Sequence, residues 1–270
     1  MQRPPRPMRR GLTLTELLVA TTIMVMIAGA MSTLAMTAHS SNTHCRGQIE
    51  SSQHARVSLG RIEQALEKAV ANEQFPACLV VAEQSGGEEL PQTLVVWSPT
   101  GTAASPAGLP LVSELVVFSP DPASPNKLLE IRWPTNTDTA PVASDTSSWQ
   151  SLVDSFRTSQ TNDRTVLTDK LRTAALSGDW TNSLSASQLR GAVRFRRVLA
   201  PTAQAWTEYR AGTRAWQDLD WPLDSYRATS GTRQVVVQTE LQVVAGNMAA
   251  AGSTALPFFG STSFVYELPR

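Results

Sequence analysis

Residues 9–38 read RRGLTLTELLVATTIMVMIAGAMSTLAMTA, and this stretch decides the architecture of the chain. Leu17 to Ala38 forms a run of 22 residues without a charge, rich in Leu, Val, Ile, Met and Ala. Because a helix rises about 1.5 Å per residue, the run covers the roughly 30 Å hydrocarbon core of a bilayer. Arginines precede the run and none lies within it. The positive-inside rule therefore predicts that residues 1–11 stay cytoplasmic and that the remainder crosses the membrane.

An ordinary signal peptide also begins with a basic segment and an apolar run. Its apolar segment is shorter, about 7 to 15 residues, and ends at a small-x-small cleavage site. Here the run is longer and a helical pattern continues beyond it. The sequence favours a retained membrane anchor over a removed signal peptide.

Glu16 lies at the edge of the apolar run, where a carboxylate is costly if it moves toward the bilayer centre. A segment selected only for anchoring gains nothing from this residue. Taken alone, Glu16 has two interpretations, an interfacial side chain that reaches back to the lipid headgroups or a residue with a specific task.

The hexapeptide GLTLTE at residues 11–16, preceded by two arginines and followed by LLVA, resembles the class III signal of type IV pilins and type II secretion pseudopilins. The resemblance implies that a prepilin peptidase cuts the Gly11-Leu12 bond and methylates the new amino group of Leu12. It also makes Glu16 the acid that assembly requires. Leu12 replaces the commoner phenylalanine, and Thr15 stands where an aliphatic residue is more usual. The motif covers about a tenth of the chain.

A charge-pairing argument gives Glu16 its task in such a protein. Cleavage would create an α-ammonium group at Leu12 that is largely charged at neutral pH and is buried when helices bundle. A carboxylate four residues away, on the same or a neighbouring subunit, would compensate it. Buried pairs of this kind stabilise weakly but specify register.

The resemblance implies a structural minor subunit, assembled through its N-terminal helix into a type II secretion pseudopilus or type IV pilus, at the tip. The implied partners are the prepilin peptidase, other pilins or pseudopilins, and membrane lipid. The implied location is the cytoplasmic membrane, crossed once, with the head outside. The large head, the segment 216–221 and a long Val-rich strand suggest a J-type or W-type minor subunit. The alternative is a membrane-anchored binding or adhesion module that uses a prepilin signal.

The first helix is expected to run well past the membrane. No proline occurs between Pro7 and Pro76, and apolar residues continue at three-four spacing, which predicts one helix from about Thr13 to Glu73. Residues 12–38 form its membrane half and residues 39–75 its amphipathic extracytoplasmic half. Gly47 and Gly60 are the positions most open to a bend.

The head, residues 76–270, changes to short β-branched runs between stretches rich in Pro, Ser, Thr, Ala and Gly. The predicted fold class is α+β, with the long helix packed on an antiparallel sheet. Strands are expected at Leu79–Ala82, Thr93–Trp97, Glu114–Phe118, Leu128–Trp133, Arg190–Leu199, Arg233–Val244 and Thr262–Leu268, and short helices at Ser148–Phe156 and Thr165–Leu176.

The composition and motifs give little support to nucleic-acid binding or to enzymatic activity. Without the four arginines of the first ten residues, acidic residues outnumber basic ones by four, which argues against nucleic-acid binding. The three histidines, His39, His44 and His54, all fall on the expected helix, so the head lacks a His-based catalytic or metal site. Phosphate-binding loops and nucleophile elbows are absent from the sequence. We expect no enzymatic activity and no cofactor.

Cys45 and Cys78 are expected not to form a disulfide. About 30 residues of helix separate Cys45 from the expected helix end, or about 45 Å, and the chain after Phe75 can return only about 10 Å. A disulfide needs Cα atoms within about 7 Å.

One loop gathers oxygen ligands of the kind that calcium uses, from Asp218, Asp220 and Asp224. The alternative is a solvated loop flanked by Trp216 and Trp221. The other tryptophans are expected in the core or at interfaces rather than on a carbohydrate platform: Trp97, Trp133, Trp149, Trp180 and Trp206.

Overall fold

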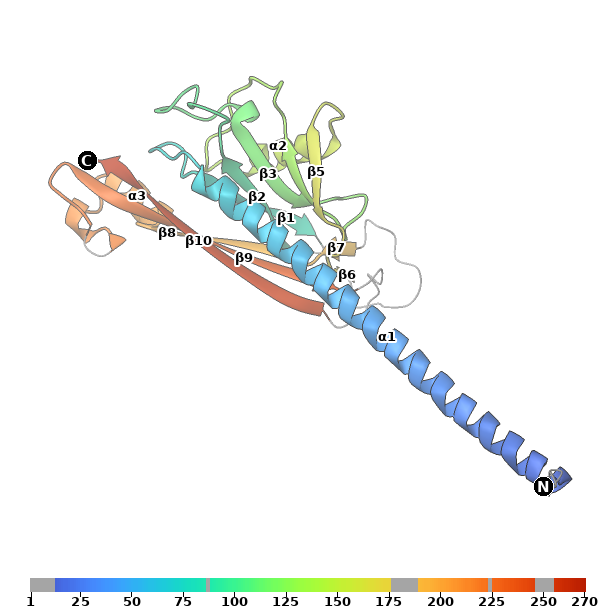
Figure 1. The fold of residues 1–270 in the computed structure, drawn as a ribbon. Helices are drawn as coiled ribbons and strands as arrows, with labels where there is room; N and C mark the ends of the chain where they lie inside the picture. Colours follow the sequence, from blue (N-terminus) through green and yellow to red (C-terminus); the bar gives the residue numbers. More distant parts are fainter. Residues whose placement is uncertain (1–12, 86–87, 176–188, 223–224, 246–254) are drawn as a thin grey trace, which may run out of the picture. The chain divides into compact units, whose positions relative to one another are not determined.

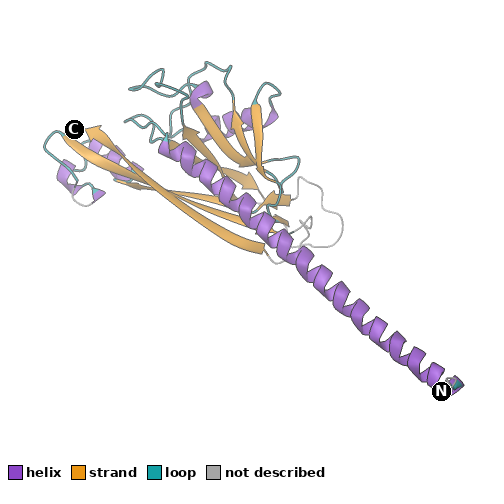
Figure 2. Cartoon of the chain, viewed as in Figure 1, coloured by secondary structure: helices purple, strands orange, loops and turns teal. Residues whose placement is uncertain are grey.

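The structure is a computed structural model that describes residues 13–85, 88–175, 189–222, 225–245 and 255–270. The chain divides into two units, residues 1–47 and 48–270. One long helix, α1 (Leu14–Glu67), contributes to both units and is followed by antiparallel sheets (Figure 1). The predicted α+β class is confirmed, and Figure 2 shows the succession of helices and strands.

Helix α1 has 54 residues, about 81 Å at 1.5 Å per residue. Its first half is exposed along its whole length and is long and apolar enough to span a membrane. Its second half buries one face at three-four spacing, as predicted, and it runs without interruption through Gly47 and Gly60. The buried residues are Ser51, Ala55, Ser58, Ile62, Ala65 and Leu66.

The end of α1 was predicted wrongly, at Glu73 instead of Glu67. The backbone N–H of Val70 donates to the Trp97 carbonyl oxygen at 2.9 Å and therefore cannot continue the helical ladder. Two residues later the Asn72 side chain accepts from the N–H groups of Gln74 and Phe75, each at 2.8 Å. One contact with a residue distant in sequence and one local turn thus follow the end of the helix.

The first sheet is a five-stranded antiparallel meander in the order β1-β2-β3-β4-β5. Its first four strands confirm the prediction. The predicted helix over 165–176 is wrong, because Thr165 and Val166 pair with Glu130 and Leu129 of β4. The strands are β1 (Cys78–Ser85), β2 (Glu88–Trp97), β3 (Leu115–Pro120), β4 (Leu128–Arg132) and β5 (Asp163–Thr168), with a short 3-10 turn η1 (Val112–Glu114) before β3.

The two faces of this sheet enter different cores because side chains alternate along a strand. Leu94 and Val96 of β2 join a cluster that includes α1 residues Ile62 and Leu66. The alternate side chains, with Trp97 among them, pack in a second cluster against helix α2 (Thr146–Thr158). Helix α2 was predicted at Ser148–Phe156, and the Asp145 side chain caps it by accepting from the Ser148 N–H.

A second, three-stranded sheet has the order β10-β9-β8. Its inward side chains, such as Phe195, Val235 and Val237, share the α1 cluster with the first sheet. The strand predicted at Arg190–Leu199 is divided between β7 and β8, and β9 and β10 are longer than predicted. The bounds are β6 (Thr173–Ala175), β7 (Leu189–Gly191), β8 (Val193–Ala200), β9 (Ser230–Val244) and β10 (Ala255–Pro269), with β6 and β7 forming a separate pair.

Helix α3 (Ala203–Arg210), which was not predicted, and the 3-10 turn η3 (Trp216–Asp218) complete the fold. They build a third core around Trp206, Trp216 and Trp221, with the two rings of the last pair 4.6 Å apart. Trp97 and Trp149 are also buried, which confirms the core position predicted for Trp97, Trp149 and Trp206. Trp133 packs at the edge of the α2 cluster, and Trp180 lies outside the described residues.

Candidate functional site

The predicted assembly residue, Glu16, lies in the first turn of α1, whereas Gly11 and Leu12 lie outside the described residues. Glu16 forms reciprocal hydrogen bonds with Thr13. The backbone N–H and the hydroxyl of Thr13 each donate to Glu16 Oε2 at 2.9 Å, and the Glu16 N–H donates to Thr13 Oγ1 at 3.3 Å. This arrangement is a capping box, which satisfies backbone donors that a helix start leaves open.

Sequence reasoning missed the role of Thr13, although the T-x-x-E spacing of residues 13–16 is its usual signal. The capping box fixes the Glu16 carboxylate on the backbone N–H of Thr13. Thr13 would be the second residue after cleavage at Gly11-Leu12, so the carboxylate is tied to a position one residue beyond the predicted new N-terminus. Glu16 thereby has a local structural role in addition to the expected pairing role.

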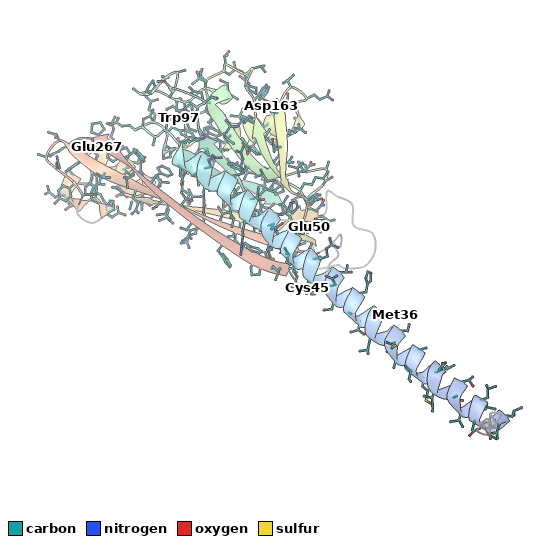
Figure 3. The ribbon with its side chains drawn as sticks, viewed as in Figure 1. Met36, Cys45, Glu50, Trp97, Asp163 and Glu267 are labelled. Carbon is teal, nitrogen blue, oxygen red and sulfur yellow. The ribbon has the colours of Figure 1, made fainter. Side chains whose placement is uncertain are left out.

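The surface of α1 that follows Glu16 is apolar and exposed. Between Leu14 and Cys45 the sequence contains no other Asp, Glu, Lys or Arg. Leu18 is 61% exposed and Met31 68% exposed, and the side chains of Met36 and Cys45 extend from the helix (Figure 3). By length and composition, a helix with such an exposed apolar surface is able to span a membrane.

The proposed calcium ligands do not gather within the described residues. Asp218 ends the η3 turn and Asp220 lies two residues further, both with exposed side chains, whereas Asp224 lies outside the described residues. The described part of the chain contains no group of three or more His, Cys, Asp or Glu placed to hold a metal ion. The neighbouring Trp216 and Trp221 belong to the third core.

Two buried polar clusters in the described part of the head link helices, strands and loops. Arg157 of α2 is buried, donates to Ser119 Oγ at 2.8 Å and Thr93 Oγ1 at 2.7 Å, and forms an ion pair with Glu83. These residues lie far apart in the sequence, so no local sequence pattern predicts the cluster. It fastens α2 to the first three strands of the meander.

Glu114 plays a similar structural role beside Trp97. One of its oxygens accepts from Trp97 Nε1 at 3.0 Å and from the Leu111 N–H at 3.1 Å, and the other accepts from the Ala104 N–H at 2.6 Å. Both side chains are buried. The carboxylate therefore organises the loop between β2 and β3.

A surface hollow of about 480 Å³ lies on the three-stranded sheet. Its charged groups are the guanidinium groups of Arg194 and Arg196 and the carboxylate of Glu240, beside the exposed ring of Phe259. The lining pairs no nucleophile with a His or Lys base, so the hollow gives no support to an acyl-transfer or hydrolytic site.

The two cysteines are both free, as predicted. Cys45 is exposed on α1, and Cys78 is buried at the start of β1. Burial raises the pKa of the Cys78 thiol to about 12. A thiol held neutral in this way behaves as a small apolar core residue and not as a nucleophile.

Comparisons with protein-family models, with curated proteins and with solved structures found no match to this chain. Its function is therefore inferred from its own residues and their geometry.

Proposed function

We propose that this chain is a prepilin-like membrane subunit. A prepilin peptidase removes residues 1–11, methylates Leu12, and releases a helix that holds the β-rich head outside the cytoplasmic membrane. The mature chain then enters a type II secretion pseudopilus or a type IV pilus. The observation that carries the proposal is Glu16, a single carboxylate at the start of an exposed apolar helix and directly behind an Arg-Arg-Gly leader.

The exposed first half of α1 supports this proposal. An apolar surface of that length is unstable in water and needs lipid before assembly and neighbouring helices after it. The same helix then continues into the head, where Ile62 and Leu66 are buried in the core. One helix can thus enter the membrane or a helix bundle with its first half and pack in the head with its second half.

The capping box supports the proposed role of Glu16. Because Thr13 fixes the carboxylate at the helix start, the charge stays near the amino group that cleavage at Gly11-Leu12 would create. In an apolar bundle that ammonium group needs a compensating charge, and the requirement sets the register between subunits. A helix that serves only as a membrane anchor needs no such counter-charge.

The role is structural and non-enzymatic. The buried polar residues Arg157 and Glu114 hold loops and helices in place, and the surface hollow lacks a nucleophile paired with a base. The head of residues 76–270, with two main sheets, is large for a subunit that repeats at every step of a filament. A low-copy position at the tip, as in a J-type or W-type minor subunit, suits its size.

Site-specific photocrosslinking along residues 17–38 in living cells tests the proposal. We expect crosslinks to the N-terminal helices of other prepilins, at positions that repeat with helical spacing, and loss of those crosslinks in Glu16→Ala. Gly60→Ala is the control, because Gly60 lies on α1 outside the crosslinked segment and a Cβ there meets no atom within 4 Å. A fully processed protein that crosslinks only to lipid would contradict filament assembly and support the binding-module alternative.

A further inference from the structure

Arg233 of β9 is a buried cation with an incomplete set of partners. Its side chain is 4% exposed. Nε donates to the Pro201 carbonyl oxygen at 2.8 Å, and Nη1 makes a long hydrogen bond of 3.5 Å to the Tyr266 hydroxyl. Nη2 is buried and has no hydrogen-bond partner among the described residues.

A second guanidinium group lies on the same inner face of the three-stranded sheet. Arg197 of β8 is partly buried, and its Nη1 donates to the Cys78 carbonyl oxygen at 2.5 Å. Burial lowers the pKa of Arg197, and the positive charge of Arg233 lowers it further. The positive charges of Arg233 and Arg197 act against the burial that raises the pKa of Tyr266. The next residue on β10 is the exposed Glu267, which Figure 3 labels.

The described residues place no carboxylate within 4.0 Å of either guanidinium group. Arg157 provides the comparison inside the same head, since it is equally buried but forms an ion pair with Glu83. Arginine stays protonated in proteins, so Arg233 cannot shed its charge as a buried lysine can. A buried charge without a counter-charge is strongly unfavourable, and this pair therefore needs an anion.

We propose that Arg197, Arg233 and Tyr266 form a binding site for a small oxyanion of the phosphate class. The anion accepts from the free Nη2 of Arg233 and from the remaining N–H groups of Arg197, with the Tyr266 hydroxyl as a third donor. Guanidinium groups match the oxygens of such anions in charge and geometry. Arg197 is the more exposed of the two arginines.

The site is tested by thermal unfolding of the full chain in detergent, with inorganic phosphate replacing chloride at constant ionic strength and pH. A ligand that binds only the folded state stabilises it saturably. We expect the wild-type melting temperature to rise by about 5 °C at phosphate concentrations about 100-fold above the dissociation constant. Arg233→Met should lose the saturable rise and should be at least as stable as the wild type in chloride, because the substitution removes an uncompensated buried charge.

Arg196→Met is the matched control, since Arg196 neighbours Arg197 on β8 but is exposed in the hollow on the sheet. It should retain the phosphate response, and Arg197→Met should lose it, which keeps the test valid if Arg233→Met does not fold. A wild type without a saturable response, or an Arg233→Met protein that keeps it, would overturn the site.

Discussion

Arg61 of α1 and Glu130 of β4 form a two-pronged ion pair, with Nε at 3.1 Å from Oε2 and Nη2 at 3.0 Å from Oε1. Glu130 is 5% exposed and has a second partner in Arg132, at 3.3 Å. The pair joins the second half of the long helix to β4 of the meander.

Arg61→Ala is expected to lower the free energy of unfolding of the head by about 1 to 3 kcal/mol, because it leaves the buried Glu130 carboxylate with one cation fewer. Arg56→Ala is the control, an exposed arginine on the same helix. Chemical denaturation of the full chain in detergent measures both. Equal stability of the two variants would mean that the pair contributes nothing measurable.

Gly231→Ala is expected to destabilise the third core, since a Cβ at this position would lie 2.3 Å from the Trp221 ring. The ring has to shift away from β9, at a cost of about 1 to 3 kcal/mol. Tryptophan fluorescence and the melting temperature report the shift and the loss. Gly101→Ala is the control, because a Cβ there meets nothing within 4 Å. If Gly231→Ala melts like the wild type, the packing of Trp221 on β9 is wrong.

Cys78 is expected to make the head less stable at alkaline pH. Its pKa is raised by burial from 9.0 to about 12, so above pH 9 the unfolded chain loses the thiol proton while the folded chain keeps it. The unfolded state then binds fewer protons, and the free energy of unfolding falls by about 1.4 kcal/mol per pH unit between pH 9 and 12. Cys78→Ala should remove that part of the slope. Identical alkaline slopes in the two proteins would contradict the burial of the thiol.

Local sequence patterns were sufficient to predict much of the fold. The β-branched runs that became β1 to β4 alternate between two cores, and the three-four spacing around Ile62 placed the correct face of α1 inward. Where prediction failed, a distant partner decided the outcome. Val70 bonds to Trp97 and ends α1 early, and Val166 pairs with Leu129 to form a strand in a segment predicted as helix.

The candidate sites also differ in whether the local sequence predicts them. Glu16 and its capping partner Thr13 are three residues apart, so the sequence contains both the assembly motif and the helix cap. The buried Arg157 and Arg233 and the partly buried Arg197 lie in strands and helices whose local sequence does not predict their burial. Their environment depends on contacts between residues far apart in the chain, which one sequence does not reveal.

Three substitutions, at Thr13 and Glu16, separate the cap of α1 from the charge of Glu16. Thr13→Val removes the hydroxyl from the capping box but keeps the carboxylate, so processing and assembly should continue. Glu16→Ala should be processed but should fail to assemble, because the ammonium group of Leu12 loses its counter-charge, and Glu16→Asp should be intermediate. Sheared-filament fractions and crosslinks measure assembly. If Thr13→Val fails as completely as Glu16→Ala, helix capping rather than charge pairing is the essential role.

The mass of the mature N-terminal peptide tests the central claim most directly. The full chain is isolated from membranes of cells that contain a prepilin peptidase, with peptidase-deficient cells and Gly11→Ala as controls. The account predicts a peptide that begins at N-methylated Leu12 in the first case, and an intact leader with its four arginines in both controls. A chain that keeps residues 1–11 in the presence of active peptidase, or that is cut beyond Ala38, would contradict the prepilin assignment.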